Sequence, residues 1–432
     1  MTNLHCNIAG IDSINPFWLA SAPPTDKYIN VKRAFDAGWG GVVWKTLGID
    51  PPVINTSSRY GVHHDRSRGI LGINNIELIS DRPLAINLAE IEQIRREYPD
   101  RVVIGSMMAP IEKSAWQELA VKIANSGVHG LELNFGCPHG MCERGMGSAI
   151  GQVPEMVEQV TRWVRQAVDL PVFTKLTPNI TNILWSAEAA QRGGCHGLAL
   201  INTVNSITSV DLDLMAPTPT VDGKGTHGGY CGSAVKPIAL NMVAEIARNA
   251  ETKQMTISAI GGIETWRDAA EFIALGASGL QVCTAAMLYG FRIVEDMKAG
   301  LQNFMAEKGY AHLDDFRGKA VANTVDWNDL NLNFDSKAFI KQAQCIGCGR
   351  CHIACEDTSH QAIRFDTNSQ GLRRFTVLDD HCVGCNLCAH VCPVPDCIEM
   401  RTVDNGQPRL TWPQHPKNPL RTDVPVSKNT EV

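Results

Sequence analysis

Eight of the fifteen cysteines lie between residues 345 and 392, in two runs that have the same spacing. Each run reads C-x2-C-x2-C-x3-C, and Pro393 follows the second run. This spacing is typical of two [4Fe-4S] clusters, because three thiolates of one run cap a cluster and the fourth cysteine binds the other cluster. We therefore expect the ligand sets Cys345, Cys348, Cys351 with Cys392, and Cys382, Cys385, Cys388 with Cys355.

Zinc and disulfides are the alternative uses of these cysteines. A structural zinc site would use two CxxC pairs and leave four of the eight cysteines without a function. A chain of 432 residues does not need disulfides crowded into one stretch. Its N-terminus also lacks a signal-peptide pattern, so we expect a cytoplasmic protein. Cys397 lies outside the cysteine pattern as a spare thiol, and Cys142 has no assigned role.

The clusters imply a second cofactor elsewhere in the chain. An iron–sulfur module carries single electrons, so the second cofactor should accept either one or two electrons. Flavin is the usual cofactor of this kind. Glycine and hydroxyl residues at strand ends fit its phosphate, because backbone N–H groups bind phosphate there. A buried lysine would stabilise the anionic reduced ring, the alternative being a lysine that extends its amine to solvent. The cofactor-binding candidates are Ala20, Ser21, Lys45, Thr46, Lys175, Gly232, Ser233, Gly261, Gly262, Cys283 and Thr284, with Ser233 expected as a helix cap.

From residue 16 to about residue 305, a short apolar run followed by a helical segment occurs eight times. These strand and helix elements must position the cofactor-binding candidates. Eight such units favour a closed (β/α)8 TIM barrel over an open doubly wound sheet. The active site of such a barrel lies at the C-terminal ends of its strands. Two of the loops there, 136–152 and 205–235, are long enough to be lids or binding loops. The runs are PFWLASA, GGVVWKT, RVVIGSM, HGLELNF, PVFTKLT, HGLALIN, TISAIGG and GLQVCTA.

Composition divides the chain further and excludes several classes of function. We expect a barrel domain at 1–305, a connector at 306–340, a ferredoxin-type domain at 341–400 and a polar C-terminal tail at 401–432. A net charge of −6 offers no basic surface for nucleic acid, and no run of about 18 apolar residues could span a membrane. The G-x-G-x-x-G match at 223–228 does not join a strand to a helix, so we expect no nicotinamide site.

Four segments and the two cysteine runs together form a specific pattern. The segments are NFGCPHGMCERGMGSAIGQ, KLTPNIT, INTVNS and HGGYCGSAVKPIAL. From about Pro16 to Met400 the chain resembles the FMN and iron–sulfur half of dihydropyrimidine dehydrogenase, above all the bacterial PreA-type catalytic subunits. The FMN barrel is shared with the dihydroorotate dehydrogenases.

The resemblance implies reduction of uracil or thymine at the 5,6 double bond. Hydride would pass between flavin N5 and C6, and a proton between Cys137 and C5. A thiol suits this role because its ordinary pKa near 8.5 keeps it mostly protonated at neutral pH while leaving a competent base for the reverse reaction. The alternative is a small, buried apolar cysteine, which describes most lone cysteines.

The same resemblance assigns the substrate-binding positions. Asparagine suits a pyrimidine, whose edge alternates N–H donors and C=O acceptors. A single loop asparagine is more often a turn former, but three asparagines at equivalent strand ends favour substrate binding. Residue 136 departs from the pattern, because it is glycine where the mammalian enzymes have serine. The assigned residues are Asn75, Asn134, Asn202 and Thr203 for the pyrimidine, and Glu77 and His139 near the active site, with His139 assisting proton delivery.

A partner protein is also implied. Mammalian relatives carry FAD and nicotinamide-binding domains in the same chain, whereas this sequence begins at the FMN barrel. The resemblance therefore implies a hetero-oligomer of pyrimidine catabolism, in which a PreT-type FAD- and NAD(P)H-binding flavoprotein subunit sends electrons through the clusters to FMN. Two alternatives remain, namely a flavin dehydrogenase acting on dihydroorotate or another cyclic amide, and a non-catalytic electron-transfer adaptor.

Overall fold

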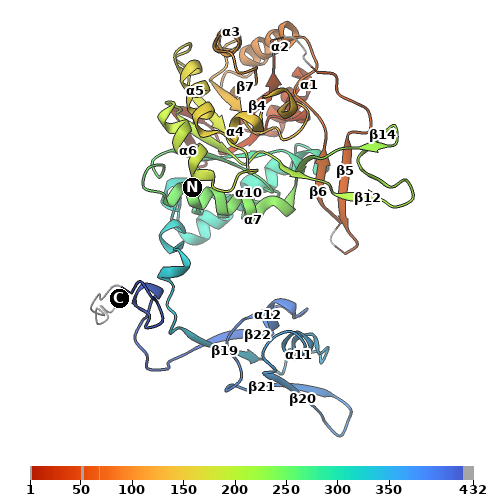
Figure 1. Ribbon diagram of the computed structural model, residues 1–432, viewed down its shortest axis with the longest axis vertical. Coiled ribbons are helices and arrows are strands. Elements are labelled where there is room, and N and C mark those ends of the chain that lie inside the picture. Colours follow the sequence, from red (N-terminus) through yellow and green to blue (C-terminus); the bar gives the residue numbers. More distant parts are fainter. Residues whose placement is uncertain (1, 50–52, 68, 422–432) are drawn as a thin grey trace. The chain divides into compact units, whose positions relative to one another are not determined.

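Eight parallel strands close into a barrel that is surrounded by helices (Figure 1). Each of the eight predicted apolar runs forms one strand, with β4 reaching one residue beyond its run, and the order around the barrel follows the chain. The strands are buried along nearly their whole length, as expected for a parallel sheet covered by helices. They are β3 (Phe17–Leu19), β4 (Gly41–Leu47), β7 (Val102–Met107), β8 (Gly130–Asn134), β9 (Val172–Lys175), β10 (Gly197–Leu200), β17 (Thr256–Ile260) and β18 (Gly279–Val282).

The structure is a computed structural model that describes residues 2–49, 53–67 and 69–421. It consists of two units, one reaching to Thr324 and one starting at Val325. No helix among the described residues has the length and apolar character needed to cross a membrane. The helices of the first unit are α1 (Tyr28–Ala37), α2 (Leu84–Glu97), α3 (Lys113–Asn125), α4 (Ser148–Gly151), α5 (Pro154–Arg165), α6 (Ile183–Arg192), α7 (Lys236–Arg248), α8 (Trp266–Ala274), α9 (Thr284–Tyr289) and α10 (Ile293–Lys308).

The barrel interior changes from apolar to polar along the strands. Near the N-terminal ends, a hairpin of β1 (Cys6–Ile8) and β2 (Ile11–Ser13) packs its isoleucines against Trp18 and Phe173. A Cβ on Gly279 would lie 2.5 Å from Ile8 Cδ1, so a larger residue there would displace the Ile8 side chain. Nearer the C-terminal ends, the buried side chains are polar or charged and include Lys45, Glu132, Lys175, Ser258 and Gln281. The sequence therefore builds an apolar base below a polar site.

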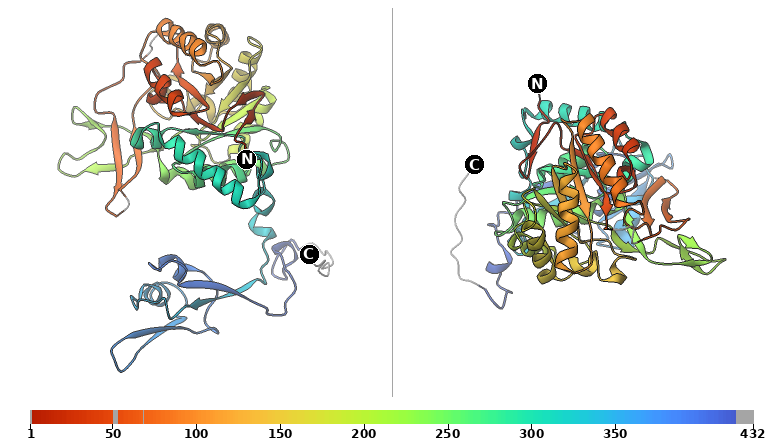
Figure 2. Two further views of the ribbon diagram at one scale, coloured as in Figure 1. Left: turned by 180° about the vertical axis from the view of Figure 1, so that it is seen from behind. Right: turned by 90° about the horizontal axis from the view of Figure 1, so that it is seen from above.

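A four-stranded antiparallel sheet is inserted through the loops after β4 and β10. Its order is β11 (Val204–Ser206), β16 (Gly228–Cys231), β6 (Gly69–Asn75) and β5 (Tyr60–Asp65). Two small hairpins continue it, β12 (Ser209–Asp211) with β13 (Ala216–Thr218) and β14 (Thr220–Val221) with β15 (Lys224–Gly225). β5, β6 and these hairpins extend from the side of the barrel (Figure 2). The sequence predicted the second loop only as long and did not predict the sheet.

Two details of this region bear on the sequence predictions. The G-x-G-x-x-G match spans a turn and strands of the antiparallel hairpins, not a strand-to-helix turn, as expected. Ser233 is not a helix cap, and that prediction was wrong. It is the first residue of a short 3-10 helix, and Gly232 takes the capping position with a φ of 107°, which favours glycine. The Ser233 hydroxyl instead donates a hydrogen bond to the Leu71 carbonyl at 3.1 Å.

The second unit pairs two antiparallel ladders with two short helices. Its small core joins Ile340, Ile363 and Phe375 with several cysteines. The helices lie within the two cysteine runs. The elements are β19 (Asp335–Ile340), which pairs with β22 (Ile398–Val403), β20 (Ile363–Thr367), which pairs with β21 (Arg373–Val377), and the helices α11 (Arg350–Glu356) and α12 (Leu387–Val391).

Candidate active site

One cavity at the C-terminal ends of the barrel strands collects the predicted residues of the first unit. It encloses about 1180 Å³ when its opening to solvent is included, which is the scale of sites for cofactors and small ligands. Ser233 is the exception among the predictions and does not line the cavity. The residues that do line it are Ala20, Ser21, Lys45, Thr46, Asn75, Glu77, Asn134, Cys137, His139, Lys175, Asn202, Thr203, Gly232, Gly261, Gly262, Cys283 and Thr284.

Glycines at one wall of the cavity expose backbone. Gly232, Gly261 and Gly262 all have positive φ angles. A Cβ on Gly262 would lie 2.9 Å from the Lys236 nitrogen and 3.0 Å from the Gly232 carbonyl oxygen, and one on Gly261 would lie 2.8 Å from Ala239. A side chain would fill this space, which fits the close approach of a phosphate to backbone N–H groups. An apolar cluster of Ala20, Ala199 and Ile260, with Cys283 against it, adds a surface suited to a flat ring.

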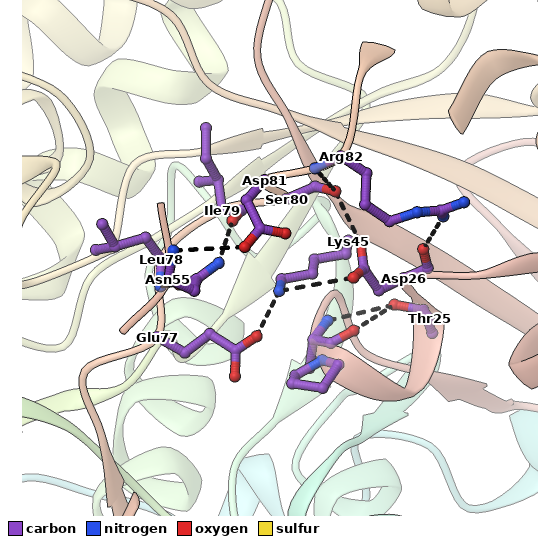
Figure 3. A network of polar contacts seen from close by, with 12 residues as sticks. Thr25, Asp26, Lys45, Asn55, Glu77, Leu78, Ile79, Ser80, Asp81 and Arg82 are labelled. Atoms are coloured by element: carbon purple, nitrogen blue, oxygen red, sulfur yellow. Dashed lines mark hydrogen bonds and ion pairs between the residues drawn. The ribbon is translucent and has the colours of Figure 1, made fainter. Parts of the chain in front are cut away.

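Lys45 is held by two carboxylates (Figure 3). Its ammonium lies 2.5 Å from Glu77 Oε1 and 4.0 Å from Asp26 Oδ2. Burial raises the pKa of Asp26, and a hydrogen bond of 2.8 Å from Ser80 supports its carboxylate. The Tyr60 hydroxyl also donates to Glu77. Lys45 is therefore a fixed, compensated cation and not a lysine that extends to solvent.

Lys175 has a carboxylate partner of its own. The ammonium lies 3.4 Å from Oε1 of Glu132, and both side chains are buried. Gln281 donates to Oε2 of Glu132 at 2.9 Å and to Ser258 at 3.0 Å. Both lysines of the cavity are thus paired with an acid, a feature that the sequence analysis did not predict.

Cys137 and His139 lie next to each other at the start of the loop after β8. Burial raises the pKa of the Cys137 thiol to about 11, and the thiol donates to the His139 carbonyl at 3.5 Å. The His139 ring is bonded through Nε2 to the Glu77 carbonyl at 3.1 Å, so Nε2 carries the proton and Nδ1 is an acceptor. Burial lowers the pKa of His139. At neutral pH the pair is a neutral thiol beside a neutral imidazole.

The asparagines are oriented by a chain of hydrogen bonds. Asn202 Nδ2 donates to Asn134 Oδ1 at 2.9 Å, and Asn134 Nδ2 donates to Thr46 at 3.0 Å. The Thr203 backbone N–H donates to Asn202 Oδ1 at 2.8 Å. This chain fixes which end of each amide faces the cavity. Gly136 is required beside it, because a Cβ there would lie 2.3 Å from the Cβ of Asn202.

Asn75 reaches the cavity from a different element. It ends β6 of the inserted sheet and not a barrel strand, so the expectation of asparagines at equivalent strand ends was wrong for this residue. Its Nδ2 donates to the Gly229 carbonyl at 2.9 Å. The same sheet brings Tyr60 and Tyr230, which the sequence analysis missed, to the cavity. Their strands carry no apolar alternation that would have placed them there.

The eight cysteines of the second unit separate into two groups. One small cavity is lined by Cys345, Cys348, Cys351 and Cys392, and a second by Cys355, Cys382, Cys385 and Cys388. The last cysteine of each run thus lies with the other run. Thiolate sulfurs are the ligands that iron–sulfur clusters use, so both groups fit a cluster. The buried Cys397 also lines the first cavity.

Two known protein families match the chain, one in each of its two units. The family described as Dihydroorotate dehydrogenase matches residues 3–305, and the family described as 4Fe-4S dicluster domain matches residues 338–400. The NAD-dependent dihydropyrimidine dehydrogenase subunit PreA of Escherichia coli K12 is 43% identical over 407 residues, which cover 93% of this chain and 96% of PreA.

Two further relatives are more distant. The chloroplastic dihydropyrimidine dehydrogenase (NADP(+)) of Arabidopsis thaliana is 42% identical over 76% of this chain and 79% of its own. The catalytic subunit of dihydroorotate dehydrogenase B (NAD(+)) of Pyrococcus abyssi is 34% identical over 74% of this chain and 99% of its own. The chain therefore belongs to the dihydroorotate dehydrogenase family and, within it, to the dihydropyrimidine dehydrogenases that carry a 4Fe-4S dicluster domain.

Proposed function

We propose that this chain is the catalytic subunit of a dihydropyrimidine dehydrogenase that interconverts uracil or thymine and the 5,6-dihydropyrimidine. Its cofactors are FMN and two [4Fe-4S] clusters. The observation that carries the proposal is the single cavity in which a buried neutral thiol, oriented asparagines and two paired lysines meet beside exposed glycine backbone. FMN supplies the hydride that the pyrimidine ring accepts at C6.

Each residue of the cavity takes a defined part in this reaction. Cys137 gives its proton to C5 when the pyrimidine is reduced, and the thiolate takes it back in the reverse direction. The raised pKa of the thiol keeps the proton in place at neutral pH. His139 Nδ1 takes up a proton from solvent and passes it to the thiolate, which restores the thiol for the next turnover. Asn75, Asn134, Asn202 and Thr203 read the donors and acceptors of the pyrimidine edge.

The cofactor is held by the remaining residues. Gly232, Gly261 and Gly262 bind the FMN phosphate through backbone, and Thr284 begins the helix α9 at the same wall. Lys45 and Lys175 stabilise negative charge on the flavin ring. In the second unit the two cysteine groups hold the clusters, with Cys355 and Cys392 exchanged between the runs.

We further propose that electrons arrive from a separate FAD-containing subunit that oxidises NAD(P)H. A similar protein is named as a subunit of an NAD-dependent enzyme, and the one G-x-G-x-x-G match here lies in an antiparallel hairpin. The clusters then connect the flavin of the partner with FMN. Cluster cysteines need a reducing compartment, so we place the complex in the cytoplasm.

An anaerobic titration tests the proposal. The purified chain, reduced by dithionite and freed of excess dithionite, should show its flavin absorbance return when uracil or thymine is added. One dihydropyrimidine should form for every two electrons that the flavin and the clusters lose. Orotate should be a poor oxidant, because both cavity lysines already have a carboxylate partner. A reduced flavin that reacts with orotate and not with uracil would assign the chain to dihydroorotate chemistry. A flavin that reacts with neither would favour an electron-transfer adaptor.

A further inference from the structure

A buried acid lies directly below the cavity described above. Glu132 is 1% exposed and points into the barrel from β8, two residues before the cavity residue Asn134. Asn134 pairs in register with Lys175 on the neighbouring strand β9. Glu132 therefore lies one inward position deeper in the barrel than the lysine with which it is paired.

The contacts of Glu132 organise the two other polar groups of this layer. The Lys175 ammonium is 3.4 Å from Oε1, which is an ion-pair distance and longer than a normal hydrogen bond. Oε2 accepts a hydrogen bond of 2.9 Å from Gln281. Because an isolated buried charge is very unfavourable, each member of the pair compensates the charge of the other.

The Gln281 amide is oriented by these bonds. Its Nε2 has two N–H groups, and they donate to Glu132 and to Ser258. Its Oε1 is buried and has no hydrogen-bond partner among the described residues, yet Gln281 lines the cavity. A buried carbonyl oxygen without a partner is costly, and an N–H donor of a bound ring would satisfy it.

We propose that Glu132 is a positioning residue that sets the electrostatics of the FMN site through Lys175 and Gln281. The inference rests on the proposed function, because it assumes that the cavity holds FMN. Glu132 neutralises Lys175, so the floor of the cavity carries a paired charge and not a free cation. It also turns the Gln281 amide so that the carbonyl oxygen is left to accept from a flavin N–H.

The charge balance gives a direction for the effect. A flavin gains negative charge when it is reduced and when sulfite adds to N5, and a cation nearby stabilises both products. Removing the negative charge of Glu132 leaves Lys175 uncompensated, so both equilibria move toward the anionic product. Removing Lys175 leaves Glu132 uncompensated and moves them the other way. Removing both restores neutrality.

The test compares E132Q, K175Q and the double variant E132Q/K175Q with the parent protein. The parent should contain one FMN per chain. E132Q should bind sulfite about tenfold more tightly than the parent and K175Q about tenfold more weakly, with the double variant close to the parent. The FMN midpoint potentials should follow the same order, a tenfold change for a two-electron couple being about 30 mV. E158Q, which removes a carboxylate on the exposed surface of α5, should leave both values unchanged.

Several results would overturn the inference. If every variant contains FMN and all have the same sulfite affinity and midpoint potential, Glu132 does not act on the flavin. A shift of E132Q toward weaker sulfite binding contradicts the sign of the charge argument. If E132Q loses its FMN, K175Q is compared with the parent instead. A K175Q variant with the sulfite affinity and midpoint potential of the parent refutes the proposed role of the Glu132–Lys175 pair. A parent chain without any FMN would instead overturn the proposed function, and this inference with it.

Discussion

Cys137 combines two properties that a proton donor in a closed site needs. Its side chain is 9% exposed, and burial raises its pKa to about 11. The thiol therefore keeps its proton through the neutral range, while the thiolate formed by donation is a strong base that recovers the proton. The His139 carbonyl, which accepts a hydrogen bond from the thiol, fixes its direction.

The two directions of the reaction should depend on pH with opposite sign. Pyrimidine reduction needs the protonated thiol, so its rate stays high across neutral pH and falls as the pH rises toward the thiol pKa of about 11. Dihydropyrimidine oxidation needs the thiolate, which is scarce at neutral pH, so its rate rises over the same range. Profiles of kcat/KM with artificial electron donors and acceptors measure both. Parallel slopes in the two directions would rule out Cys137 as the titrating group.

Replacement of Cys137 by alanine should separate chemistry from binding. Turnover should fall by roughly 10² to 10⁴, the usual contribution of a general acid, while FMN content, iron content and pyrimidine affinity stay close to the parent. Cys142→Ala is the matched control, because it removes a nearby thiol in the same loop. Near-full turnover of the Cys137 variant would transfer the acid role to another group, and His139 would be examined first.

At the scale of elements, the inserted antiparallel sheet completes a site that the barrel alone leaves open. β6 and β16 pair so that Asn75 lies opposite Gly229, and Gly229 packs against Thr203, which directly precedes β11. A side chain on Gly229 would lie 2.3 Å from the Thr203 hydroxyl. The sheet thus sets the distance between Asn75 and Thr203, the residues of two separate loops that we propose bind the pyrimidine.

Gly229→Ala should therefore damage substrate binding without damaging the cofactors. The methyl group must displace Thr203, so we expect the KM for uracil to rise about tenfold or more, the loss of one or two good contacts. FMN and iron contents should not change. The control is Gly223→Ala in the hairpin turn, where the φ of 73° strains an alanine but a Cβ meets nothing within 4 Å, so the backbone is disturbed without displacing Thr203. An equal rise of KM in both variants would indicate a general disturbance of the sheet and not a displaced Thr203.

At the scale of the whole molecule, the two units have separate cores and separate cofactors. The barrel core and the cysteine-containing core share no residue. Purified anaerobically, the chain should contain about eight irons and one FMN. Air should bleach the clusters before the barrel unfolds, as followed by visible absorbance and by the thermal unfolding of the barrel. Metal analysis that returns zinc in place of iron would refute the cluster assignment.

We expect NADH oxidation and uracil reduction to occur on separate subunits. NADH should not drive uracil reduction by the purified chain, because no strand-to-helix dinucleotide loop occurs in its described barrel. A low-potential chemical donor should support the reaction, and the flavoprotein partner should restore its dependence on NADH. The measurement is uracil consumption under each donor. Sustained NADH-driven turnover by the chain alone would contradict the division of labour proposed above.

The local patterns of the sequence were sufficient to predict the barrel and the two groups of cluster cysteines. Parallel strands buried on both faces must be continuous apolar runs, so all eight could be read directly, and the cysteine spacing likewise fixed which residues group together. Of the sixteen residues predicted to bind substrate or FMN, all but Ser233 line the cavity at the C-terminal ends of the strands, whereas their roles remain predictions.

Long-range pairing decided the rest. The inserted sheet joins segments more than a hundred residues apart, and its short, glycine-rich strands have no apolar period that marks them. The acids that compensate Lys45 and Lys175 come from other segments of the chain, and a sequence shows two charges without the distance between them. The sequence thus determined which residue types are present. The tertiary structure decided their burial and charge balance, because these arise only when distant segments pack together. Burial sets the pKa of Cys137, and charge balance sets how far Lys45 and Lys175 are neutralised.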